Sequence, residues 1–141
     1  MDTKIKPENR NKVPEKLTKS FKNAGNSTFA IGIFMLVALP AEAFILHFLG
    51  GALNLSSFLV IYLLMAIFMA YFIFAGWGMK KDTFTNAKKS YTRALLLMII
   101  SLVSVFVFAP GGILLIFYIL LIINNMIAFS QISKYKKIIG Y

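Results

Sequence analysis

Four long apolar stretches, separated by shorter polar ones, dominate the pattern along this chain. They cover residues 29–49, 58–77, 94–109 and 113–130. A helix needs about 20 residues to cross the hydrocarbon core of a membrane, and about 17 can suffice. The third stretch reaches that length when it is extended back through Tyr91 and Thr92. The pattern therefore predicts an all-α protein, an integral membrane bundle of four transmembrane helices.

The breaks between these stretches are of two kinds. Residues 50–57 contain Gly, Asn and Ser but no charge, and Pro110-Gly111-Gly112 separates the last two stretches. Clusters of this composition indicate tight turns. The middle break, residues 78–93, is longer and strongly basic. We therefore expect two tight helical hairpins that are joined by one basic loop.

The positive charges predict the orientation of the chain. All 15 Lys and Arg residues lie in three segments, namely 1–27, 78–93 and 134–137. Because membrane proteins concentrate Lys and Arg on the cytosolic side, both termini and the middle loop are expected in the cytosol. This divides the chain into a cytosolic basic arm, a transmembrane domain and a cytosolic tail, at residues 1–27, 28–135 and 136–141.

Composition supports a membrane protein and excludes several other classes. Hydrophobic residues make up 59% of the chain and charged residues 14%, whereas soluble domains have about 25% charged residues. The net charge of +10 follows from the predicted topology, so we expect the lipid bilayer as a partner and no nucleic acid. The Lys-, Ile-, Phe- and Asn-rich composition favours a bacterial plasma membrane.

Enzymatic chemistry finds little support in the sequence. The chain has no cysteine and a single histidine, so neither a disulfide nor a conventional zinc site is expected. It contains no phosphate-binding or hydrolase motif in a credible context. We therefore expect a protein that is not an enzyme and that needs no cofactor or metal.

The N-terminal arm has two interpretations. Apolar residues recur there at helical spacing: Val13, Leu17, Phe21 and Ala24. Pro14 suits the first turn of such a helix and Gly25 suits its end. The segment is either an amphipathic helix on the inner leaflet or a floppy basic arm that serves topology alone. The lysines expected at the lipid surface are Lys16, Lys19, Lys22, Lys80, Lys81, Lys88 and Lys89.

The same arm imitates a signal peptide. A basic leader is followed by an apolar run and by Ala41-Glu42-Ala43, which has the small-residue pattern of a cleavage site. The apolar run continues through residues 44–49, which makes it long enough to span the membrane. We therefore expect this segment to be retained as the first span.

Glu42 is the only carboxylate inside a predicted span. Because an acid in the membrane costs roughly 2.5–3.5 kcal/mol on insertion scales, such residues usually face the interior of the bundle. Polar residues of the other spans are its candidate partners, which gives a candidate intramembrane polar site of Glu42, Tyr62, Ser104, Tyr118, Asn124 and Asn125. These side chains either form a proton or cation site or hold the helices together by hydrogen bonds.

The layout resembles the small four-span membrane proteins of low-GC Gram-positive bacteria, which are mostly of unknown function. In these proteins a basic leader precedes two tight hairpins, and a basic stretch after the second span is similar to Gly76-Trp-Gly-Met-Lys-Lys81. Some bacteriocin-immunity proteins share this size and topology. The resemblance implies a type of family and not an activity.

Two functions are compatible with these observations. The first is a non-enzymatic accessory or interaction protein of the transporter-subunit, immunity or regulatory type, which docks within the membrane as a homo-oligomer or in a larger complex. The alternative is a small proton- or cation-coupled transporter or channel that uses Glu42. The predicted bundle offers few convergent polar groups, so we favour the first.

Overall fold

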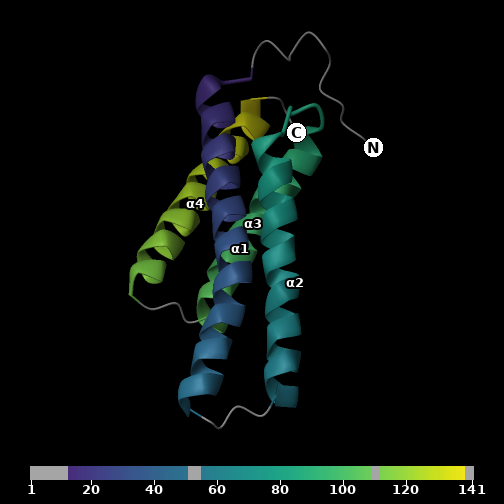
Figure 1. The fold of residues 1–141 in the computed structure, drawn as a ribbon. Coiled ribbons are helices and arrows are strands. Elements are labelled where there is room, and N and C mark those ends of the chain that lie inside the picture. The colour runs from purple at the N-terminus through teal and green to yellow at the C-terminus, as the bar shows by residue number, and fades with distance from the viewer. Residues whose placement is uncertain (1–12, 51–54, 109–111, 139–141) are drawn as a thin grey trace.

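The computed structural model describes residues 13–50, 55–108 and 112–138, which form four helices (Figure 1). They are α1 (Glu15–Gly50), α2 (Leu55–Lys80), α3 (Ala87–Phe108) and α4 (Ile113–Ile138). Within them, side chains are described except at residues 39, 42–50, 55–58, 61, 107, 108, 113 and 138. All regular secondary structure of the described residues is helical, so the predicted all-α class is confirmed.

Three of the helices are long and apolar enough to cross a membrane. The qualifying segments are Tyr62–Lys80, Ala87–Phe106 and Leu114–Lys137. They overlap most of the second, third and fourth apolar stretches that the sequence predicts as spans, at 58–77, 94–109 and 113–130. The first predicted span falls in α1, where the side chains of residues 42–50 lie outside the described set, and it stays a prediction.

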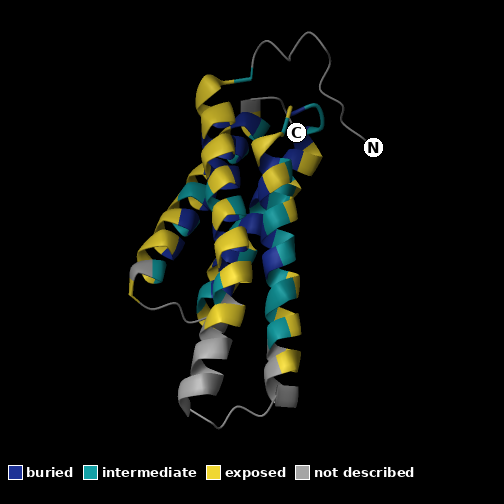
Figure 2. Cartoon of the chain, in the orientation of Figure 1, coloured by how far each residue is buried: buried dark blue, intermediate teal, exposed yellow. Residues whose placement is uncertain are grey.

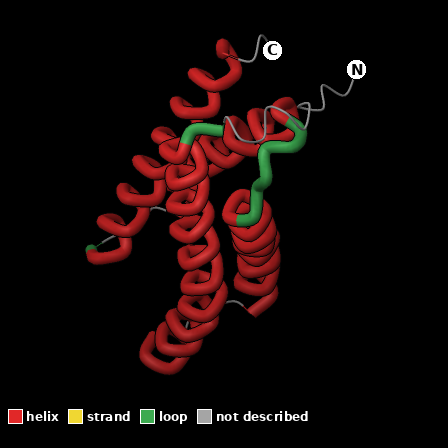
Figure 3. The backbone as a smooth tube through the Cα atoms, turned by 90° about the horizontal axis from the view of Figure 1, so that it is seen from above, coloured by secondary structure: helices red, strands yellow, loops and turns green. Residues whose placement is uncertain are grey.

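The helices are arranged around a ring, and successive helices run in opposite directions (Figure 1). Helix α1 packs against α2 and α4, α4 packs against α3, and α2 touches α3 only lightly. The start of α1, the loop between α2 and α3, and the end of α4 lie at the same end of the molecule, at the top of Figure 1, and Figure 3 views the bundle from above. We call this side the basic end, because the described lysines outside the spans gather there.

The first turns of α1 belong to the bundle itself. The predicted helix end at Gly25 is wrong, because α1 continues without a break from Glu15 to Gly50. The apolar side chains of this segment are turned inward, with Leu17 and Phe21 each 1% exposed. Glycine in a helix costs about 1 kcal/mol relative to alanine, and tertiary packing overrides a penalty of that size.

Gly25 serves a different purpose, which is close contact between α1 and α2. A Cβ atom at Gly25 would lie 2.6 Å from the backbone nitrogen of Lys80 and 2.7 Å from the carbonyl oxygen of Gly76. A Cβ atom at Gly76 would lie 2.7 Å from the backbone nitrogen of Phe29. Small residues at such crossings let helix backbones approach one another in membrane proteins.

The outer faces of the bundle are apolar. Phe74 on α2 is 77% exposed and Phe106 on α3 is 87% exposed. Buried residues concentrate between the helices near the basic end, and exposed ones cover the outside (Figure 2). In water, large exposed apolar surfaces are unfavourable. The distribution therefore fits a bundle whose outside is covered by lipid or by other membrane helices.

Candidate functional site

Two asparagines of α4 make hydrogen bonds to α1. The side-chain amide of Asn124 donates to the hydroxyl of Ser27 at 2.6 Å, and that of Asn125 donates to the hydroxyl of Thr28 at 3.4 Å. Asn125 and Thr28 are fully buried. Thr28 in turn donates to the carbonyl oxygen of Ala24 at 2.8 Å. These four side chains, Ser27, Thr28, Asn124 and Asn125, form what we call the α1–α4 polar cluster.

Ser104 and Tyr118 meet elsewhere in the bundle. Both side chains are fully buried, on α3 and α4 respectively, and the Tyr118 hydroxyl lies beside Ser104. The Ser104 hydroxyl donates to the carbonyl oxygen of Ser101 at 2.8 Å. The Tyr118 hydroxyl itself has no partner within hydrogen-bond geometry among the described residues. Along α4, Tyr118 is about 9 Å from Asn124, since a helix rises 1.5 Å per residue.

The candidate intramembrane residues therefore fall into separate places. Asn124 and Asn125 make hydrogen bonds to α1, whereas Ser104 and Tyr118 lie next to each other without a hydrogen bond in good geometry. Tyr62 is partly exposed on α2, a helix whose backbone does not come close to that of α4 in the described part of the chain. The side chain of Glu42 lies outside the described residues. Ser27 and Thr28 were not among the sequence candidates. Two hydroxyl side chains just before an apolar stretch could have indicated a hydrogen-bonding site at the end of that stretch.

Asp82 organises the loop that joins α2 to α3. One of its oxygens, Oδ1, accepts hydrogen bonds from the backbone nitrogen of Phe84 and from the hydroxyl of Ser90, both at 2.8 Å. The other oxygen, Oδ2, accepts one from Nη1 of Arg93 at 2.7 Å. Nη1 of Arg93 also donates to the carbonyl oxygen of Gly78 at 2.9 Å. A single carboxylate thus connects the end of α2 to the second turn of α3.

Phe84 anchors this loop to α1. Its φ angle is +55°, which is in the left-handed region, and its side chain is 3% exposed. A left-handed conformation costs a residue with a Cβ atom roughly 1–2 kcal/mol. Burial of the ring against Phe21, with the centroids 4.8 Å apart and an angle of 65° between the planes, offsets that cost. The loop at the basic end therefore has a defined conformation, which is held by hydrogen bonds and by packing against α1.

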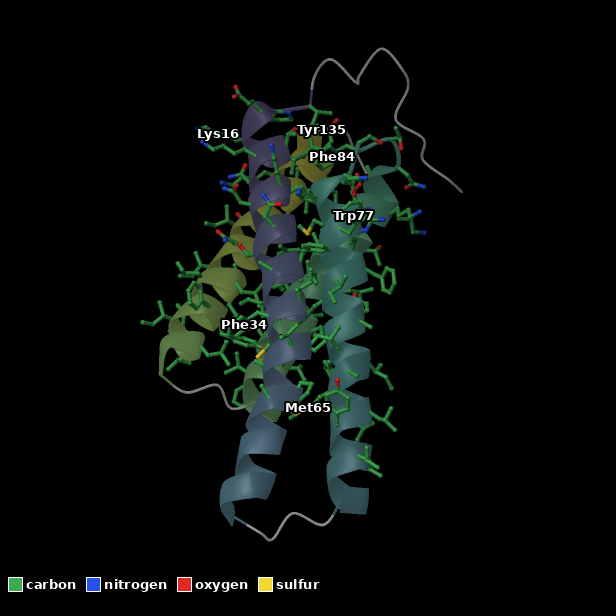
Figure 4. All side chains as sticks on the ribbon, in the orientation of Figure 1. Lys16, Phe34, Met65, Trp77, Phe84 and Tyr135 are labelled. Atoms are coloured by element: carbon green, nitrogen blue, oxygen red, sulfur yellow. The ribbon has the colours of Figure 1, made fainter. Side chains whose placement is uncertain are left out.

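All seven lysines predicted at the lipid surface are exposed, and polar side chains gather around the basic end (Figure 4). Lys81 extends its amino group over the ring of Trp77, 4.0 Å from the centroid. Cations over aromatic rings of this kind stabilise by about 0.5–1 kcal/mol at exposed sites. Lys16 and Lys19 line a cavity of about 240 Å³ between α1 and α4.

Two further cavities adjoin the loop of Asp82. A polar one of about 210 Å³ is lined by residues of the loop and of the first turns of α3, and includes Lys81, Lys89 and Arg93. A larger one of about 670 Å³ runs between α2 and α3. The same Lys89 and Arg93 line both, so the two cavities are neighbours.

These places offer hydrogen-bonding groups and positive charge. Among the residues that the structure describes, no group of three or more His, Cys, Asp or Glu side chains is placed to hold a metal ion. Comparisons with known protein families, with curated proteins and with solved structures found no match for this chain. The interpretation therefore rests on the geometry of the chain itself.

Proposed function

We propose that this protein is a four-span integral membrane protein of a bacterial plasma membrane, with both termini in the cytosol, and that it acts as a non-enzymatic accessory or interaction protein. It docks within the membrane against a second copy or a larger complex. Three helices with the length and composition of spans support the membrane location. The positive charges at the basic end support the orientation, because such charges stay in the cytosol.

The α1–α4 polar cluster is the observation that carries the proposal. Side chains that would line a polar path in a transporter are instead paired with each other across two helices. Hydrogen bonds of this kind hold membrane helices together and contribute about 0.6–2 kcal/mol each. The amides of Asn124 and Asn125 therefore act as structural contacts, and the outer apolar faces are left as the surfaces available to a partner.

The proposed orientation predicts the labelling of introduced cysteines. The natural chain has no cysteine, so Asn54→Cys and Thr83→Cys each report a single position. In intact spheroplasts, a membrane-impermeant maleimide should label Asn54→Cys, because the proposed topology puts this position on the outer side. It should label Thr83→Cys only after the membrane is opened. The reverse pattern would mean an inverted bundle, and labelling of both positions before opening would contradict the four-span topology.

Docking within the membrane predicts cross-links from the outer faces. A photoreactive phenylalanine analogue at Phe74, Phe106 or Phe117 replaces an exposed aromatic residue by a similar shape, whereas Phe72 is fully buried and provides the matched control. In native membranes at least one outer position should give a discrete protein adduct, identifiable by mass spectrometry as a partner or a second copy. The Phe72 position should give none. Adducts to lipid alone at every outer position would contradict docking.

Transport is the second candidate. The buried Tyr118 hydroxyl without a hydrogen-bond partner, beside Ser104, is the kind of polar group that a proton or cation path can use. If cross-linking shows only lipid, Glu42→Gln in reconstituted vesicles becomes the deciding variant. Loss of transport with normal expression would favour the Glu42 mechanism, and unchanged transport would exclude it.

A further inference from the structure

The groove between α2 and α3 is amphipathic along its length. Its apolar part is formed by Tyr71, Phe74 and Ala75 of α2 with Leu96 of α3. Its polar part, toward the basic end, is formed by the first turns of α3 and includes Lys88, Lys89, Thr92 and Arg93. A volume of about 670 Å³ falls within the range of about 300–1,000 Å³ that is typical of small-molecule sites. We call this cavity the α2–α3 groove.

The charge around the α2–α3 groove favours an anion. The groove and the polar cavity beside it are lined by four cationic side chains and a single carboxylate: Lys81, Lys88, Lys89, Arg93 and Asp82. Asp82 is already paired with Arg93. The lysines therefore retain an unbalanced positive charge at the point where the groove changes from polar to apolar.

Arg93 is held in place by hydrogen bonds within the chain. Both hydrogen bonds that it makes to described residues start from Nη1, to Asp82 and to Gly78. The donors on Nε and Nη2 remain for other acceptors, and the side chain is 25% exposed. Because its position is fixed by two bonds, Arg93 loses little conformational freedom on binding. Planar guanidinium donors of this kind suit phosphate oxygens.

We propose that the α2–α3 groove binds a phospholipid with an anionic headgroup. Its phosphate lies among Lys88, Lys89 and Arg93, and one acyl chain follows the apolar wall past Phe74 and Leu96. Basic pockets between transmembrane helices on the cytosolic side bind anionic lipid headgroups in this way. The proposal rests on the membrane location given above but not on the accessory role, so either can fail alone.

The apolar wall distinguishes a lipid from a free anion. The α1–α4 cavity with Lys16 and Lys19 is also basic, but it is smaller and Ile127 is its single large apolar residue. Of these two cavities, it is the α2–α3 groove that joins its cations to an extended apolar surface. The two exposed lysines of the α1–α4 cavity therefore provide a matched control, because replacing them removes as much charge as replacing Lys88 and Lys89.

Lipid retention tests the proposal. The full-length chain is reconstituted in phosphatidylcholine vesicles that contain a minor fraction of phosphatidylglycerol, extracted in mild detergent, and its bound lipids are counted by native mass spectrometry. The wild type should retain phosphatidylglycerol in preference to phosphatidylcholine. Lys88→Gln with Lys89→Gln should reduce that preference by roughly twenty-five-fold at most, since each lysine near anionic lipid contributes about a five-fold factor.

The control variant combines Lys16→Gln with Lys19→Gln and should leave the preference within about two-fold of the wild type, because these lysines line the α1–α4 cavity and not the groove. An equal loss of lipid preference in both variants would show diffuse attraction and overturn the site. An unchanged preference in both variants would overturn it as well. Glycerophosphoglycerol, which has the headgroup without acyl chains, should not displace the lipid. Displacement at matched concentration would show a site for a free anion and overturn the assignment to a lipid.

Discussion

Gly25→Ala and Gly76→Ala are each expected to lower the free energy of unfolding by about 2–3 kcal/mol, because the added methyl group meets backbone atoms of the neighbouring helix. At Gly25 the new Cβ atom would lie 2.6 Å from the nitrogen of Lys80, and at Gly76 it would lie 2.7 Å from the nitrogen of Phe29. Backbone cannot rotate away as a side chain can. The two helices must separate, and packing along the α1–α2 contact is lost.

The sign of this effect is diagnostic. In a helix interior, alanine is more favourable than glycine by about 1 kcal/mol, so helix propensity alone predicts stabilisation. Gly78→Ala is the matched control, because a Cβ atom there would first meet side-chain atoms, the guanidinium of Arg93 at 3.3 Å, which has to yield by only a few tenths of an ångström. Reversible unfolding in mixed detergent micelles gives the three free energies. A rise in stability for Gly25→Ala or Gly76→Ala would contradict the close contact.

Asp82→Ala is expected to lower the free energy of unfolding by about 2–3 kcal/mol, which is the range for breaking a partly buried charge pair. The Asp82 side chain is 7% exposed and accepts hydrogen bonds from Phe84, Ser90 and Arg93. Without it, Arg93 loses its partner and the left-handed conformation of Phe84 loses its hydrogen bond. Amide hydrogen exchange across residues 81–90 should therefore speed up together with the loss of stability.

A second pair of variants separates charge from shape in the same loop. Asp82→Asn keeps the acceptor oxygen for Phe84 but loses the charge, so its effect should fall between the wild type and Asp82→Ala. Thr83→Ala removes an exposed hydroxyl, which lies 3.4 Å from that of Thr85, and should change stability by less than about 0.5 kcal/mol. An Asp82→Ala protein as stable as Thr83→Ala would show that the carboxylate does not hold the loop.

The Asp82 loop also connects stability to the proposed lipid site. Arg93 lines the α2–α3 groove and is positioned by Asp82. The carboxylate therefore acts as a positioning group for one of the cations that line the groove. The exposed lysines of the groove make no such bond in the described structure, which is why Lys88 and Lys89 are the variants that test binding without disturbing the fold.

Local pattern determined a large part of this protein. The second, third and fourth apolar stretches became helices of spanning length because a run of apolar residues without charge is stable in lipid as a helix, whatever it packs against. The exposed lysines also follow from local chemistry, since a charged side chain stays at a polar surface. Neither property depends on which helix is the neighbour.

Tertiary structure decided what depends on neighbours. Gly25 has the local signature of a helix end, and only the close approach of α2 shows why α1 continues through it. Asn124 and Asn125 are polar residues in a span, and only the rotation of α4 against α1 selects Ser27 and Thr28 as their partners. In the sequence, Asp82 is a single acid in a basic loop. Only the tertiary structure shows that it pairs with Arg93, which lies eleven residues further along the chain. Such pairings depend on how helices rotate and approach one another, and hydrophobic periodicity along one segment does not contain that information.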